Sequence, residues 1–244
     1  GRWSARGALA PGGTSLLLSA FPAENAGAEG ELILNADGLP TDDQWFFVSD
    51  ADKPFTVCVV NGAPSLSPVG DETYFIRPVL DTLSVAGVKT VGASVGDLAV
   101  KDLSDNQVIL LLNPPPLSAA AVENLTRFVS AGGGLWVTAG DRGGAPSLKD
   151  LLPLTQPRTE EINEGLAWSG GADLSDLKEL LWDRVRVDRA LLGDVRPGAH
   201  VLLRTVHTNK PVLTAQPFGL GRVACWGSTV DRDWTTFPPN RPFR

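Results

Sequence analysis

The sequence predicts an α/β protein, in which a mostly parallel sheet with flanking helices and antiparallel edge strands follows a small all-β module. From Phe55 onward, short apolar runs alternate with amphipathic segments, the pattern of parallel strands joined by crossover helices. Before Phe55, apolar stretches are interrupted by Gly, Pro and acidic residues at the spacing of short strands and turns. The two patterns meet at Asp50–Pro54, so we expect domains over residues 1–52 and 53–244.

Composition and charge limit the kinds of function that are reasonable. The chain has 244 residues, 43% hydrophobic and 20% charged, which is enough to bury a full core. A net charge of -7 disfavours nucleic acid as a partner, because phosphate is bound mainly through Lys and Arg. Apolar runs such as Val108–Leu112 are far shorter than the ~20 residues of a membrane-spanning helix. Any membrane attachment is therefore expected to come from segments outside this chain.

The individual elements follow from hydrophobic periodicity and from helix-capping residues. Amphipathic spacing predicts a helix over residues 72–83, although Pro78 fits poorly inside it, and Ser118 is a candidate N-cap for a second helix that ends at Gly132–Gly134. A third, short helix is expected at Ser175–Trp182. Strands are expected at Thr14–Ala20, Gly30–Asn35, Gln44–Ser49, Phe55–Asn61, Val88–Val91, Gln107–Leu112, Leu135–Ala139, Val185–Val187, His200–Thr205, Val212–Gln216 and Arg222–Trp226.

Candidate ligand-binding residues follow the ends of the predicted strands. In open α/β sheets, ligands bind at the carboxyl ends of the strands, and these ends share one rim. The candidates in those positions are Asn61, Asn113, Asp141, Arg142, Asp231, Asp233 and Trp234. Two of the sites also have simpler structural interpretations. Asp141 suits a turn or a helix cap, and Asp231–Trp234 suits internal ion pairs that hold the final segment.

The residues needed for nucleophilic catalysis are missing from the expected position. The turn after the fourth strand of the sheet, Val137–Arg142, is where related folds carry a nucleophile, and here its tip has neither Cys nor Ser. Cys58 and Cys225 lie inside apolar runs, and neither His200 nor His207 belongs to a His-x-Glu pair. We therefore predict no catalytic residue, no cofactor and no zinc site. A disulfide between the two cysteines would require neighbouring strands.

Several motifs together resemble a known family. They are FTVCVVNG at residues 55–62, AGGGLWV at 131–137, GLGRVACWGSTVDRDW at 219–234 and GELILNADGLPTDD at 30–43. In order and spacing they resemble the class I glutamine amidotransferase-like region of bacterial aerotolerance-regulator (BatA-type) membrane proteins, which are associated with von Willebrand factor A domains. The resemblance implies a flavodoxin-like fold but not the amidotransferase reaction, because this chain departs from the catalytic pattern and lacks the Cys-His-Glu triad. It also implies a periplasmic location in an inner-membrane protein, and a partner system of von Willebrand factor A domains and MoxR-type ATPases.

Three functional hypotheses remain open at this point. The main one is a non-catalytic binding or scaffold domain that mediates protein–protein interaction. The alternative is a small-molecule binder or enzyme that uses Asp141, Asp231 and Asp233, with Mg²⁺ or Ca²⁺ as a suitable ion for such oxygen ligands. A carbohydrate-binding module is the third, and only Trp3 and Trp45 would serve it as exposed aromatic residues in the β module.

Overall fold

The chain forms two compact units, residues 1–54 and 55–244. A computed structural model describes residues 29–33, 44–48, 55–85, 87–170 and 182–237. In the first unit, β1 (Glu29–Ile33) pairs antiparallel with β2 (Gln44–Val48), close to two of the predicted strands. The predicted strand Thr14–Ala20, the predicted helix Ser175–Trp182 up to residue 181, and Trp3 lie outside the described residues.

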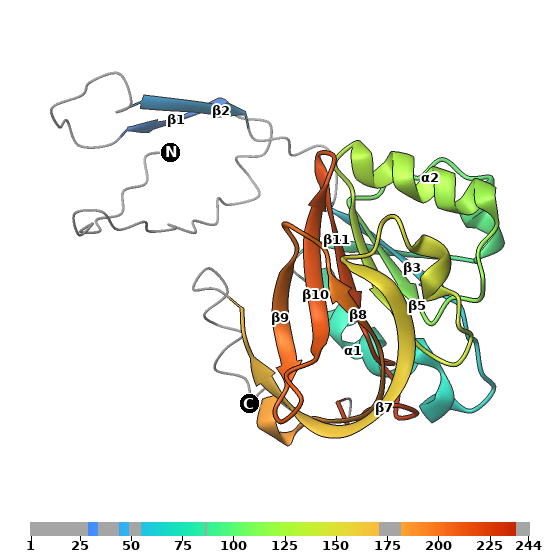
Figure 1. Cartoon of the computed structure of the whole chain (residues 1–244). Coiled ribbons are helices and arrows are strands. Elements are labelled where there is room, and N and C mark those ends of the chain that lie inside the picture. Colours follow the sequence, from blue (N-terminus) through green and yellow to red (C-terminus); the bar gives the residue numbers. More distant parts are fainter. Residues whose placement is uncertain (1–28, 34–43, 49–54, 86, 171–181, 238–244) are drawn as a thin grey trace, which may run out of the picture. The chain divides into compact units, whose positions relative to one another are not determined.

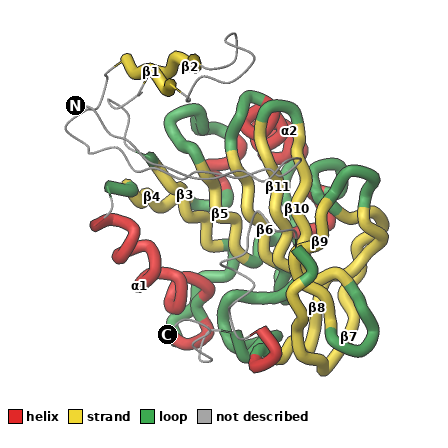
Figure 2. The backbone as a smooth tube through the Cα atoms, turned by 90° about the vertical axis from the view of Figure 1, so that its left-hand side faces the viewer, coloured by secondary structure: helices red, strands yellow, loops and turns green. Residues whose placement is uncertain are grey.

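The second unit is built on one mixed sheet of nine strands (Figure 1). Their order is β4-β3-β5-β6-β11-β10-β9-β7-β8, and all nine are labelled in Figure 2. The five strands from β4 to β11 are parallel to one another, and each later neighbour pairs antiparallel. The bounds are β3 Thr56–Asn61, β4 Lys89–Ala93, β5 Val108–Leu112, β6 Gly134–Thr138, β7 Leu154–Trp168, β8 Arg186–Val195, β9 His200–Thr205, β10 Pro211–Phe218 and β11 Gly221–Trp226.

Two α-helices flank the parallel strands, one on each face of the sheet (Figure 2). Because successive strand residues point to opposite faces, β3 contributes Cys58 and Val60 to the core beneath α2 (Ala119–Ser130), while Val57 and Val59 pack on the side of α1 (Glu72–Val85). The Ser118 side chain accepts a hydrogen bond from the amide of Ala121, which confirms the predicted N-cap of α2. Pro78 lies inside α1 without ending it.

The expected flavodoxin-like, class I glutamine amidotransferase-like architecture is wrong. That architecture needs a mostly parallel sheet with helices along both faces. In the residues that the structure describes, the nine strands make four parallel and four antiparallel pairings, and only two segments are α-helices. The antiparallel strands therefore form nearly half of the sheet and are not a minor edge extension.

The long strand β7 accounts for most of this difference. It runs for 15 residues and pairs antiparallel with both β8 and β9. Its middle part is polar and largely accessible to solvent, with Gln156 and Asn163 at positive φ where the pairing with β8 shifts register. Such a strand has no hydrophobic alternation, and this is why the sequence patterns do not predict it.

Candidate functional site

The predicted rim exists, because the carboxyl ends of β3, β5, β6 and β11 all point to one edge of the sheet. Asn61 is the last residue of β3, and Asn113 directly follows β5. Asp141 and Arg142 follow β6, and the stretch that contains Asp231, Asp233 and Trp234 follows β11. The predicted residues thus follow four different strands and lie at the same end of the parallel sheet.

Asn113 is the centre of the rim. Its side chain is buried, its backbone has φ of 41°, and its amide N donates to Thr138 Oγ1 at 2.8 Å. Its Nδ2 donates to Glu72 Oε1 at 2.8 Å, while its Oδ1 accepts from the amide of Arg142 at 3.0 Å. A Cβ on Gly140 would lie 2.1 Å from Asn113 Cγ, so the glycine is what allows the side chain to pack against this turn. Asn113 therefore joins three elements through contacts within the protein.

Glu72, which was not among the predicted site residues, is the second member of the rim. It is the first residue of α1, and its side chain is completely buried. Its Oε2 accepts from the amide of Val230 at 3.2 Å, across 158 positions of the sequence. Burial, and next the negative charge of Asp231, raise the pKa of Glu72 to about 7, although the hydrogen bonds from Asn113 and Val230 favour the ionised form.

The segment after β11 closes the rim with its own contacts. Asp231 is buried, and its Oδ1 accepts from the amide of Asp233 at 2.9 Å. Trp234 donates its Nε1–H to Asp141 Oδ1 at 2.9 Å, and the guanidinium of Arg189 lies 5.5 Å from the ring centre of Trp234. Burial, followed by the charges of Asp231 and Asp141, raises the pKa of the exposed Asp233.

The two remaining predicted residues have local roles. Asn61 Nδ2 donates to both carboxylate oxygens of Asp71, at 3.1 and 3.0 Å, and Asn61 Oδ1 accepts from the amide of Ala63. Asp71 precedes α1 and accepts from the amide of Thr73, the geometry of an N-cap. Arg142 contacts the rim through its backbone amide, and the residue is exposed.

The bend after β6 holds no pair of groups suited to nucleophilic attack. Cys58 and Cys225 lie within β3 and β11, which are separated by β5 and β6, so their backbones are roughly 14 Å apart at the usual strand spacing. Both thiols are free and buried, and burial raises the pKa of Cys225 to about 12. His200 begins β9 and His207 follows it, both exposed. Among the described residues, no three His, Cys, Asp or Glu side chains are arranged to hold a metal ion.

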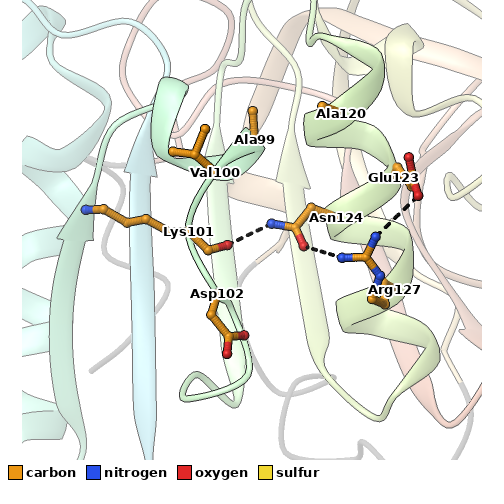
Figure 3. A pocket seen from close by; sticks show the side chains of 8 residues that line it. All are labelled: Ala99, Val100, Lys101, Asp102, Ala120, Glu123, Asn124 and Arg127. Carbon is orange, nitrogen blue, oxygen red and sulfur yellow. Dashed lines mark hydrogen bonds and ion pairs between the residues drawn. The ribbon is translucent and has the colours of Figure 1, made fainter.

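Two hollows in the described part of the chain lie away from the rim. A polar groove of about 490 Å³ lies between α2 and the loop after the 3₁₀ helix η3 (Gly96–Ala99), as Figure 3 shows. There Asn124 donates to the carbonyl of Lys101 at 2.8 Å and accepts from Arg127 at 3.1 Å. A smaller apolar hollow of about 50 Å³ is lined by aromatic and aliphatic side chains, including Trp136, Trp182 and Trp226. Neither hollow is lined by the predicted rim residues.

Because both thiols are buried, we expect neither to react with a thiol reagent such as dithionitrobenzoate in the native protein. Unfolding in guanidinium should expose both thiols, which should then react together. A Val206→Cys variant is the matched positive control, because Val206 is 48% exposed and its thiol should react before denaturant is added. Rapid native-state labelling of Cys58 or Cys225 would contradict the buried positions described above.

Comparisons with known proteins show the fold and nothing further. The sequence matches no family model and no curated protein. Cytoplasmic protein STM1381 from Salmonella typhimurium LT2 is similar in structure, with a TM-score of 0.55 at 11% identity over 74% of this chain and 90% of that one. Cytoplasmic protein STM3548 from Salmonella typhimurium is similar too, with a TM-score of 0.53 at 14% identity over 74% and 89% of the two chains.

An enzyme contains a similar unit within a larger chain. The β-galactosidase from Bacillus circulans sp. alkalophilus matches with a TM-score of 0.50 at 17% identity, over 74% of this chain and 30% of that one. At such identities the likeness concerns the fold alone.

The location implied by the sequence motifs needs correction. A periplasmic domain of a membrane-anchored, BatA-like protein disagrees with the two Salmonella structures, both of which are described as cytoplasmic proteins. Within the described ranges, no helix is long and apolar enough to cross a membrane. None of the similar structures reported above is described as a glutamine amidotransferase. We therefore withdraw the periplasmic, membrane-associated and BatA-like assignment.

Proposed function

We propose that the unit of residues 55–244 is a non-catalytic binding or scaffold module for another protein. The observation that carries this proposal is that side chains of the protein itself occupy the rim. At the strand ends where a ligand would be expected, Asn113, Glu72 and Asp231 are buried and bonded to the protein itself. Side chains that are committed to internal hydrogen bonds hold segments together and are not free to bind a substrate.

The distribution of exposed apolar side chains supports a protein partner. Six of the nine large apolar residues that are exposed in the described part of the chain fall between residues 55 and 83: Phe55, Leu66, Val69, Tyr74, Val79 and Leu83. These six residues lie close together in the sequence, and exposed apolar side chains that form a patch are typical of surfaces that contact other proteins. The correction of the location does not test the partner classes implied by the sequence motifs. Von Willebrand factor A domains and MoxR-type ATPases are therefore the first candidates.

A binding experiment with purified candidate partners tests the positive part of the proposal. We expect measurable binding by calorimetry, and at least a tenfold weakening in Val79→Asp. Val206→Asp is the matched control, because Val206 is 48% exposed against 57% for Val79 but lies beyond β9. Equal weakening by both variants, or no binding to either partner class, would count against the proposal.

An activity assay tests the non-catalytic part. We expect no release of ammonia from glutamine and no hydrolysis of a nitrophenyl β-galactoside by the purified protein. Asp141 is the exposed carboxylate at the bend, so Asp141→Asn is the informative variant if turnover is found. Turnover that disappears in this variant would establish an active site at the rim and overturn the proposal.

A further inference from the structure

Glu72 lies at the junction between α1 and the segment that follows β11. The carboxylate leaves the first turn of α1 and receives one hydrogen bond from Asn113 Nδ2 and one from the amide of Val230. Val230 belongs to the buried stretch Gly227–Asp231, which directly follows β11. The carboxyl group of Glu72, which can titrate, thus connects the start of α1 directly to this stretch.

The charges that act most strongly on this group are negative. Asp231 and Asp233, from the segment after β11, act on Glu72 in the same direction, and the loop after β5 contributes only the neutral amide of Asn113. On the N-terminal side of α1, the neighbouring Asp71 is engaged with Asn61 and Thr73. Within the described residues, no Lys, Arg or His forms an ion pair with Glu72. An ionised Glu72 would therefore be a buried carboxylate that is repelled by the buried Asp231 and forms no ion pair among the described residues.

We propose that Glu72 is a proton-controlled latch, which holds residues 230–233 against α1 when it is protonated and releases them when it is ionised. Release lets water reach both carboxylates, which removes the desolvation and the repulsion that oppose ionisation. The residues on both sides stay anchored. Trp226 Nε1 donates to the carbonyl of Thr229 on one side, and Trp234 Nε1 donates to Asp141 Oδ1 on the other. The motion is therefore a local opening at residues 230–233. This inference does not depend on the proposed function.

The direction of the pH dependence follows from the two pKa values. Glu72 titrates at about 7 in the closed rim and near its ordinary value of 4.5 when it is hydrated. Because the pKa of Glu72 is raised in the closed state, protonated Glu72 stabilises that state, and this stabilisation is fully present below about pH 4.5. It is lost as the pH rises through 7. The opening equilibrium should increase by up to about a hundredfold between pH 5 and pH 8.

Hydrogen exchange of the Val230 amide is the direct measurement, because this amide donates to Glu72. In the whole protein we expect its protection factor, corrected for the intrinsic pH effect, to fall at least tenfold from pH 5.5 to pH 8. The amide of Val223 in the middle of β11 is the internal control and should change less. In Glu72→Gln, which cannot ionise, the protection of Val230 should not depend on pH.

A second variant covers the possibility that Glu72→Gln does not fold, since its amide cannot accept both hydrogen bonds. Asp231→Asn removes the adjacent charge and should move the midpoint of the Val230 transition to lower pH. Constant protection of Val230 between pH 5.5 and pH 8, the same fall in Glu72→Gln as in the natural chain, or an unchanged midpoint in Asp231→Asn would overturn the latch.

Discussion

Gly62→Ala is expected to destabilise the protein by about 3 kcal/mol or more, because the added methyl group would overlap backbone atoms. Gly62 follows β3, and its amide donates to the carbonyl of Leu112 at 2.8 Å. A Cβ at this position would lie 2.4 Å from the carbonyl oxygen of Asn113 and 2.5 Å from Pro114 Cα. Both atoms are backbone, so rotation of a side chain cannot relieve the overlap. The ends of β3 and β5 must separate at the rim.

Equilibrium unfolding in urea, followed by tryptophan fluorescence, measures this effect. Gly92→Ala is the matched control in the adjacent strand β4, because a Cβ there meets no atom within 4 Å. The control should be neutral, or more stable by ~0.5 kcal/mol, since alanine restricts the unfolded chain. If Gly62→Ala were as stable as the control, Gly62 would not lie as close to the backbone of Asn113 and Pro114 as described here.

The parallel half of the fold was predictable because its signals are local. β5 is a run of five apolar residues, as a strand buried on both faces requires, and Ser118 with the following amphipathic stretch predicts α2. In the antiparallel half, β9 and β10 match predicted strands, whereas β7 and most of β8 carry weaker signals. β7 and the greater part of β8 are partly exposed strands with mixed polarity, so their pairing depends on tertiary contacts that no local pattern reveals.

The sequence predicts which residues lie at the rim, but it does not predict that they are buried and bonded to one another. Residues that follow parallel strands must meet at one edge, and this rule alone places Asn61, Asn113 and Asp141 together. Glu72 escaped prediction because an acidic residue in the first turn of an amphipathic helix is usually solvated and favours the helix dipole. Its burial is caused by Val230 and Asp231, which are far away in the sequence. Position in the sequence therefore identified the rim, whereas only the structure shows that the protein fills it.

Asn113→Ala should lower the free energy of unfolding by about 3 kcal/mol. The substitution removes the hydrogen bond to the buried Glu72 and leaves the amide of Arg142 without its acceptor. It also places alanine at φ of 41°, which costs ~1 kcal/mol in the left-handed region. Since the bond from Asn113 favours ionised Glu72, the loss should be larger at pH 8 than at pH 5.5.

Two further variants separate the backbone effect from the hydrogen-bond effect. Asn209 has φ of 55° and is exposed after β9, so Asn209→Ala should cost only the ~1 kcal/mol of the left-handed conformation. Asn113→Gly keeps the conformation without strain but lacks the amide, so its loss measures the hydrogen bonds together with the added freedom of the unfolded chain. If Asn113→Ala cost no more than Asn209→Ala at either pH, Asn113 would not join β5, α1 and the bend after β6. The rim would then be held by the segment after β11 alone, through Val230, Asp231 and Trp234.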